Sequence, residues 1–153
     1  MATVFSAQRT NTRASPTVKN KANELGGRIR VAHATYTAAA LASADVIELF
    51  VLPNGARLVT GSMANAALGA STTVSIGYAA YKSSANATVA LSAAAYLAAT
   101  STSSAAKTDI LATLALGSGS VLDADANGVT ITATIGGAAA TGALEVTILY
   151  VVD

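Results

Sequence analysis

From Arg28 to its end, the chain consists of short β-type segments separated by Gly-, Ser- and Asn-rich breaks. The first segment alternates from Arg28 through Tyr36, as expected of a strand with two unlike faces. The other strand candidates are Asp45–Leu52, Ala56–Thr60, Thr72–Tyr78, Thr108–Leu116, the short and weak Ser120–Leu122, Gly128–Ile135 and Ala143–Val152. About eight short strands predict an all-β fold, an antiparallel sandwich or barrel, and a jelly roll needs this number of strands.

Two local signals refine this expectation. Pro53-Asn54-Gly55 supplies a fixed φ followed by a left-handed position, which predicts a tight hairpin between the flanking segments Asp45–Leu52 and Ala56–Thr60. Thr88–Ala99 is rich in Ala and begins with a residue that can cap a helix, so it is the candidate for one short helix.

Residues 1–27 have a different character. They contain Pro16 and a closing Gly26-Gly27 among Ser, Thr and Asn residues, and no period that could bury a face. This pattern predicts an extended N-terminal arm that becomes ordered against a partner, followed by a β-sandwich domain over residues 28–153.

The charges divide along the same line. Six of the nine basic residues lie in the first 30 positions: Arg9, Arg13, Lys19, Lys21, Arg28 and Arg30. Only Glu24 opposes them there, so this region has a net charge of +5. The other 123 residues carry three basic and seven acidic residues, a net charge of −4. A basic arm before a weakly acidic domain is typical of a protein that docks on a surface.

Composition indicates the kind of surface that the domain exposes. Hydrophobic residues make up 52% of the chain, but charged residues only 11% and aromatic residues 5%. Much of the surface must then be Ala, Ser, Thr and Gly, which suits a protein that covers itself by associating. The uncharged stretch Ser83–Ala106 holds ten Ser, Thr or Asn residues, too polar for a membrane span. We therefore expect a soluble protein that is made in the cytoplasm and has no membrane partner.

Few residues are suited to catalysis. The chain has no Cys, and His33, its one histidine, lies within a predicted strand. It has neither a G-x-S-x-G nucleophile motif nor a G-x-x-x-x-G-K phosphate-binding loop. The sequence predicts no enzyme activity and no cofactor.

Asp123-Ala-Asp125-Ala-Asn127-Gly128 has the spacing that opens an EF-hand calcium loop. Position 12 of such a loop would be Thr134 instead of Glu, and β-branched residues follow where a helix should begin. We therefore predict a β-turn leading into a strand at Val129, and no metal site.

The basic arm could in principle bind nucleic acid or an acidic protein. Its one aromatic residue is Phe5, so it has no series of aromatic side chains for stacking on bases. The domain behind it is acidic. These features favour an acidic protein surface as the partner and argue against nucleic acid.

Three stretches resemble capsid decoration (cement) proteins of tailed bacteriophages, most of all the cyanophage type. They are VFSAQRTNTRASPTVKNKANELGGRIRVAHATYTAAALASADVIELFVLPNGARL, ALGASTTVSIGYAAY and the closing LYVVD. The similarity is one of layout: an arm ending in Glu24-Leu-Gly-Gly27, a first strand, the Leu52–Ala56 turn, a Ser/Thr/Ala-rich middle and a hydrophobic last strand.

The resemblance implies a small β-sandwich, often a jelly roll, that forms homotrimers on the outside of the head and ties neighbouring major capsid protein subunits together without catalysing a reaction. The residues that match the arm of such proteins, and would meet acidic capsid residues, are Arg9, Arg13, Lys19, Lys21, Arg28 and Arg30. The alternative is a phage head-fibre, tail or receptor-binding β module that contacts carbohydrate. Five Tyr, two Phe and no Trp offer few aromatic platforms for sugars.

Overall fold

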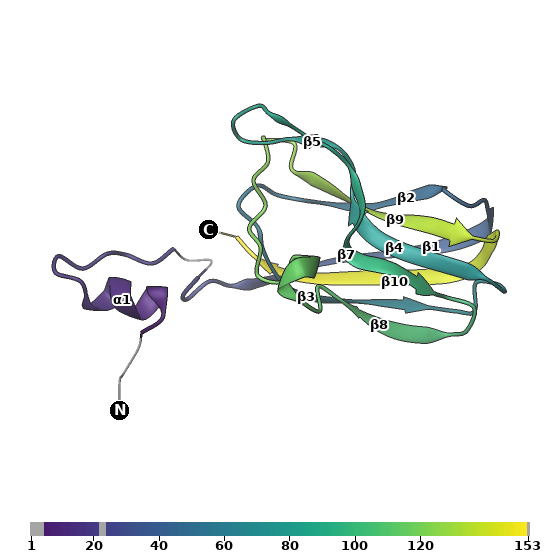
Figure 1. Ribbon diagram of the computed structural model, residues 1–153, viewed down its shortest axis with the longest axis horizontal. Coiled ribbons are helices and arrows are strands. Elements are labelled where there is room, and N and C mark those ends of the chain that lie inside the picture. The colour runs from purple at the N-terminus through teal and green to yellow at the C-terminus, as the bar shows by residue number, and fades with distance from the viewer. Residues whose placement is uncertain (1–4, 22–23, 153) are drawn as a thin grey trace.

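The computed structural model describes residues 5–21 and 24–152. Its main body is two four-stranded antiparallel sheets packed face to face, and an N-terminal segment projects beyond one end (Figure 1). In order across the first sheet lie β1 (Ile29–Leu41), β10 (Ala140–Val151), β3 (Arg57–Asn65) and β8 (Ala106–Ile110). Across the second lie β2 (Val46–Leu52), β9 (Val129–Gly137), β4 (Thr72–Tyr78) and β7 (Ser92–Ser101). The small hairpin β5 (Tyr81–Lys82) and β6 (Thr88–Val89) lies between β4 and β7 in the chain. The all-β sandwich predicted from the sequence is confirmed.

The hydrophobic core lies between the two sheets. Alternate residues of β10 face inward, so Val146 and Ile148 are fully buried while Glu145 on the opposite face is exposed. Leu58 of β3 and Ile131 of β9 reach the same core from opposite sheets. Each such side chain contributes about 1.5–3 kcal/mol by leaving water, so burial between the sheets is the main force that stabilises the body.

The chain changes sheet at almost every connection between these eight strands. β1 and β2 belong to different sheets, and so do β2 and β3, β3 and β4, β7 and β8, β8 and β9, and β9 and β10. Only the connection from β4 to β7, which carries the small hairpin, joins neighbouring strands of one sheet. Most strand pairs are therefore distant in the sequence.

The hairpin predicted at Pro53-Asn54-Gly55 is wrong, although the turn itself forms. The Ala56 N–H donates to the Pro53 carbonyl over 3.3 Å, and Gly55 has a positive φ of 76°. The strands on either side do not pair, because β2 pairs with β9 while β3 pairs with β10 and β8. Leu52 and Leu58 each point into the shared core, so the turn carries the chain from one sheet to the other.

The helix predicted over Thr88–Ala99 is also wrong. Most of this segment belongs to β6 and β7, and β7 pairs with β4 and buries Tyr96 and Leu97. Pairing and burial outweigh the helix propensity of Ala, which amounts to a few tenths of a kcal/mol per residue. The short α-helix of the structure, α1 (Ala7–Arg13), instead lies in the arm that was expected to be extended.

Two of the observed strands are shorter than predicted. The strand predicted over Thr108–Leu116 ends at Ile110, and a 3-10 turn follows at Leu114–Leu116. The weak strand at Ser120–Leu122 is reduced to a single bridge between Val121 and Arg57. The remaining strand predictions agree with the structure within a few residues at most of their ends, and β1, β3 and β10 extend several residues beyond the predicted ends.

Candidate docking arm

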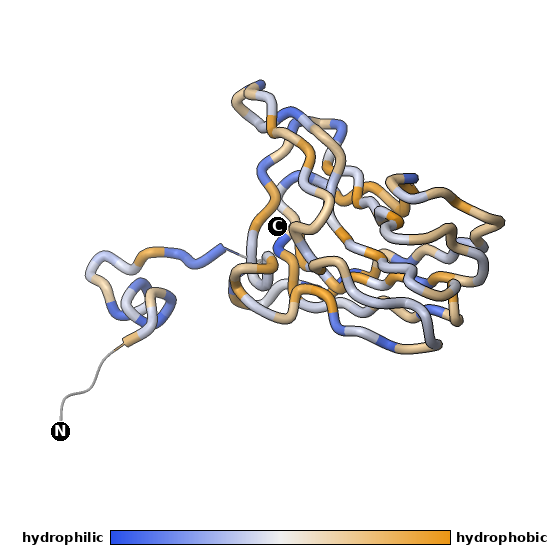
Figure 2. The backbone as a smooth tube through the Cα atoms, turned by 45° about the vertical axis from the view of Figure 1, so that its right-hand side comes forward, coloured by the Kyte–Doolittle hydropathy of each residue, from blue (hydrophilic) through white to orange (hydrophobic). Residues whose placement is uncertain are grey.

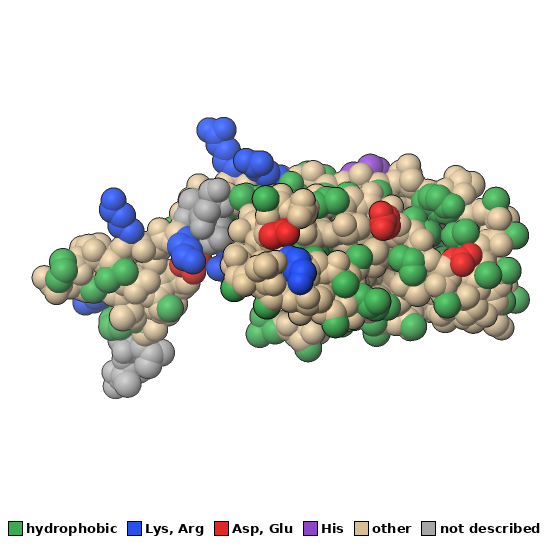
Figure 3. Space-filling model, turned by 90° about the horizontal axis from the view of Figure 1, so that it is seen from above, with side chains coloured by type: hydrophobic (Ala, Val, Ile, Leu, Met, Phe, Trp, Pro, Cys, Tyr) green, Lys and Arg blue, Asp and Glu red, His purple; other side chains and the backbone are tan. Residues whose placement is uncertain are grey.

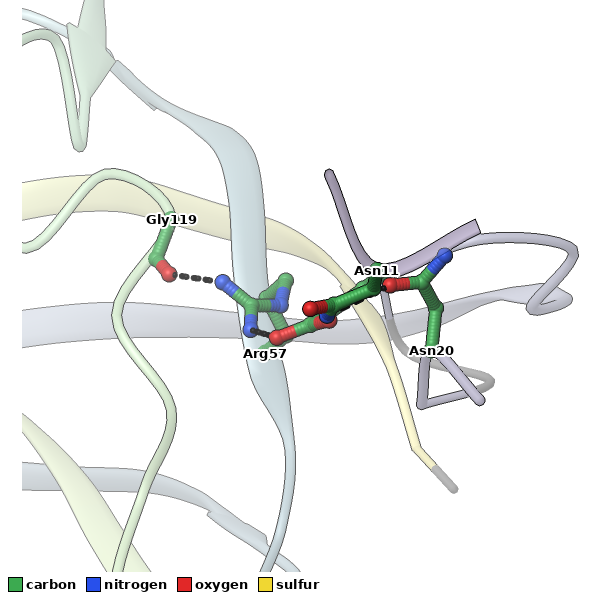
Figure 4. Close-up of polar contacts among 5 residues, drawn as sticks. Asn11, Asn20, Arg57 and Gly119 are labelled. Atoms are coloured by element: carbon green, nitrogen blue, oxygen red, sulfur yellow. Dashed lines mark hydrogen bonds and ion pairs between the residues drawn. The ribbon is translucent and has the colours of Figure 1, made fainter. Parts of the chain in front are cut away.

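The arm folds on itself through polar contacts. Ser6 caps α1 by accepting a hydrogen bond from the Arg9 N–H over 3.3 Å. The Asn11 side chain donates to Asn20 over 3.1 Å, and the Asn20 amide donates in turn to the Gln8 carbonyl over 3.2 Å. These bonds tie the segment after the helix back to the helix, as Figure 4 shows for Asn11 and Asn20.

The arm has no hydrophobic core of its own. None of its described residues, 5–21 and 24–27, is buried. It lies beyond the end of the sandwich, clear of both sheets (Figure 2). Because its surface is open, the side chains of the arm are available to a partner.

A polar junction joins the base of the arm to the body (Figure 4). Arg57 of β3 donates through Nη1 to the Gly119 carbonyl oxygen over 2.7 Å, and its Nη2 lies 3.5 Å from Oε1 of Glu24. The two side chains are only 27% and 25% exposed. Glu24, the one acidic residue of the arm, thus pairs with a residue of the body. It does not neutralise the basic residues of the arm.

The six predicted docking residues lie on the arm and at its base. Arg9 and Arg13 are on α1, Lys19 and Lys21 follow it, and Arg28 and Arg30 lie at the start of β1; all six are exposed. None of the six forms an ion pair with another described residue. Figure 3 shows most of the Lys and Arg side chains in this view on the arm and at its junction with the body, whereas the acidic side chains lie singly at the junction and over the body.

Arg13 has one further contact within the arm. Its guanidinium carbon lies 4.6 Å from the centroid of the Phe5 ring, a cation–π distance. Both side chains are exposed, so this contact restricts the guanidinium while leaving its hydrogen-bond donors open.

The other sequence candidates occupy structural positions. His33 lies on β1 as predicted, with Nδ1 3.0 Å from Thr147 Oγ1 and 3.9 Å from a Glu145 carboxylate oxygen. The β-turn predicted before Val129 is confirmed, since the Gly128 N–H donates to the Asp125 carbonyl and β9 begins at the next residue.

The two carboxylates before this turn accept hydrogen bonds from the main chain. Asp125 accepts from the Asn127 N–H over 2.8 Å, and Asp123 accepts from the Ser84 N–H over 3.2 Å. Nearby, an open hollow of about 380 Å³ is lined in part by Tyr81, Lys82 and Asp125. Among the described residues no three His, Cys, Asp or Glu side chains are grouped to hold a metal ion, and no helix is long and apolar enough to cross a membrane.

Sequence reasoning missed the junction and the helix of the arm. The helix had a local signal, because Ser6 at the N-cap precedes a run of residues compatible with a helix. The junction had none, since Glu24 and Arg57 are 33 positions apart and the Gly119 carbonyl has no mark in the sequence.

Solved structures contain chains of similar fold. A chain in the capsid asymmetric unit of cyanophage Pam1 is 17% identical with a TM-score of 0.61, and the match covers 100% of both chains. A chain in the capsid of Ralstonia phage GP4 is 18% identical with a TM-score of 0.63, over 83% of this chain and 86% of that one. A chain in the acidic stable capsid of Helicobacter pylori bacteriophage KHP30 is 20% identical with a TM-score of 0.52, over 81% and 87%. No protein-family model and no curated protein sequence matches the chain. At these identities the likeness establishes a shared fold.

Proposed function

We propose that this protein is a structural component of a phage virion that decorates the outer surface of the capsid and bridges major capsid protein subunits. The observation that carries the proposal is the fold shared with a chain of the cyanophage Pam1 capsid over the full length of both chains, arm included. Two further phage capsids contain chains of similar fold. In this proposal the protein is made in the host cytoplasm and joins the head from outside.

The division into an arm, 1–27, and a β domain, 28–153, gives each part a task. The strand order, in which all but one connection between the eight main strands changes sheet, supports a jelly roll of two Greek keys. Such a domain would stand on the capsid as a rigid body. The arm, in which no described residue is buried and which extends away from the domain, would lie across a neighbouring subunit and add buried area at the seam.

The basic residues supply the chemistry of attachment. Arg9, Arg13, Lys19 and Lys21 on the arm, with Arg28 and Arg30 at its base, would pair with acidic residues of the major capsid protein. Their exposure and their lack of ion-pair partners among the described residues support this role. Charge complementarity of this kind sets orientation and speeds association. The proposal involves no catalysed reaction, cofactor or nucleic acid.

Self-association into a homotrimer belongs to the same proposal. Large apolar side chains are exposed at several places, among them Leu114 at 87%, Leu91 at 67% and Val46 at 57%. Threefold association would cover part of this surface. Light scattering on the purified protein is expected to give three times the 15.0 kDa chain mass. A single species at the chain mass would contradict the trimer.

Cryo-electron microscopy of the virion tests the main proposal. Density for this fold repeated over the whole head supports decoration. Confinement to head fibres or the tail would favour the second candidate, a fibre, tail or receptor-binding module. The hollow beside Tyr81, Lys82 and Asp125 is the feature that favours this candidate, because it combines an aromatic ring with polar groups of both signs.

A further inference from the structure

The outer edge of β1 is long, regular and open. β1 and β8 are the edge strands of the first sheet, β2 and β7 those of the second, and with 13 residues β1 is the longest of the four. Its residues 29–38 run in unbroken register against β10, and the register shifts only between Ala38 and Leu41. Among the described residues, no main-chain hydrogen bond outside the strand ladder reaches residues 29–38. One row of N–H and C=O groups on this stretch therefore faces outward.

Apart from Arg30 at its start and the register shift after Ala38, this edge lacks the protection that edge strands usually carry. Soluble proteins block such edges with charged residues, Pro or bulges, because an open edge pairs with other chains. No Asp, Glu, Lys, Arg or Pro lies between Arg30 and Asp45. The other edges differ: β8 carries Lys107 and Asp109, β2 carries Glu48, and β7 is broken by register shifts against β4.

We propose that the free edge of β1 pairs with an extended segment of the major capsid protein that carries carboxylates at the end beside Arg28 and Arg30. Main-chain hydrogen bonds would supply affinity, as in other cases where a peptide adds a strand to a sheet. The side chains of Ile29 and Val31, 63% and 61% exposed, would pack against alternate side chains of that segment. The identity of the partner rests on the proposed function, but the pairing edge is a separate statement about this chain.

Symmetry and charge favour an acid-bearing segment of another protein over a second copy of this chain as the strand that pairs with β1. Two β1 edges in antiparallel pairing form a twofold contact, which cannot generate a closed trimer. Such a pair would also place Arg28 and Arg30 beside the end of the partner's β1, where no acidic residue lies before Asp45. An acid-bearing segment of another protein neutralises both arginines.

Proline substitution at two successive positions tests the proposal. Successive residues of a strand direct their N–H groups alternately inward and outward, so one of Ala34→Pro and Thr35→Pro removes a donor from the β10 ladder and the other removes an outward donor. The variant that loses the outward donor is expected to keep a melting temperature close to that of the unmodified protein. It should bind undecorated heads about tenfold or more weakly in co-sedimentation. The matched control is the folded member of Thr108→Pro and Asp109→Pro on the edge of β8, which pairs with β3 in regular register and should bind normally.

A lysine variant keeps the test decisive if both prolines disturb folding. Thr35→Lys with Thr37→Lys places two cations on exposed positions of the same edge. Attraction to an acidic partner by charge alone would strengthen binding, whereas lysines on an edge strand hinder pairing and should weaken it. Ala85→Lys with Ala90→Lys, both exposed and away from β1, is the control of equal charge.

The outcomes separate this proposal from the proposed function. If the unmodified protein fails to bind heads, capsid decoration is wrong. If it binds and the folded β1 variant binds equally well, decoration stands and the pairing edge is wrong. If the β1 variant changes the oligomeric state while head binding is retained, the edge is occupied by a second copy and the capsid segment is excluded.

Discussion

The arm and the β domain are each stabilised by different interactions. In the domain, side chains from two sheets such as Leu58 and Ile131 are removed completely from water. In the arm no described residue is buried, and the shape rests on a helix cap, the Asn11–Asn20 hydrogen bond and a weak ion pair at Glu24. Burial stabilises a structure in isolation, whereas exposed polar bonds contribute little net free energy in water. The domain therefore has a core of its own, whereas the proposed function completes the arm against a partner.

The largest effect is expected from a cavity in the domain. Leu58→Ala should lower the free energy of unfolding by about 2–5 kcal/mol, because the removed methyl groups leave a void in a closed core. The neighbouring Val59, 40% exposed, is the control, and Val59→Ala should cost well under about 1 kcal/mol. Chemical denaturation measures both. Equal effects would contradict the distinction between the two faces of β3.

Deleting residues 1–27 should separate attachment from folding. None of the described residues removed in this way is buried, so the melting temperature of the domain is expected to stay within a few degrees. Binding to undecorated heads should fall about a hundredfold or more, because several charged contacts are lost together. Co-sedimentation measures the loss. If the shortened protein still saturates heads with unchanged affinity, the docking surface lies on the β domain.

The same contrast explains what the sequence could predict. Strand positions followed from alternation, because one face of each strand is buried and the other is not. The pairing of β2 and β3 could not be read in this way, since strands of opposite sheets turn their apolar residues toward one core and show the same pattern as a hairpin. The Ala-rich β7 was mistaken for a helix because its pairing with β4 is a tertiary effect.

The composition of the arm predicted how far it extends along the chain and what charge it carries, but not how it folds on itself. The bonds of Asn11 and Asn20 and the junction at Arg57 join residues that no local pattern connects. The basic residues were identifiable because charge is visible in the sequence, and the structure places all six of them on exposed positions.

Removing the arm charges one at a time should give graded losses of head binding. Replacing Arg9, Arg13, Lys19 or Lys21 by Ala is expected to cost about 0.5–2 kcal/mol each, depending on how far each contact is buried. Added salt should weaken binding of the unmodified protein more than binding of the variant with all four substitutions, which keeps only Arg28 and Arg30 of the six basic residues. Lys82→Ala on the domain is the control. Salt-independent binding of the unmodified protein would show that these charges are not used.

Alkaline pH should act on the domain through Tyr96. Burial, with smaller contributions from Tyr78 and Tyr81, raises the pKa of the Tyr96 phenol above its usual value of 10.0. The neutral phenol is favoured in the folded state, so stability should be unchanged below pH 10 and fall as the pH rises above it. The slope is at most about 1.4 kcal/mol per pH unit for one group. Tyr96→Phe should reduce the slope of stability against pH between pH 9 and about 11. A smaller slope should remain because burial also raises the pKa of Tyr81, and an unchanged slope would assign the effect to groups other than Tyr96.

The smallest effect is expected at the junction itself. Glu24→Gln removes the charge that faces Arg57 across 3.5 Å, but both side chains are partly exposed and Arg57 keeps its bond to Gly119. The free energy of unfolding should change by less than about 1 kcal/mol, as for other solvent-accessible pairs. The orientation of the arm should change more, because positive φ at Gly26 places a flexible residue just after the junction. Limited proteolysis of residues 1–27 is therefore expected to accelerate in Glu24→Gln and not in the control Glu48→Gln, while both melt together. Equal cleavage of all three proteins would mean that the ion pair between Glu24 and Arg57 does not hold the arm in the free protein.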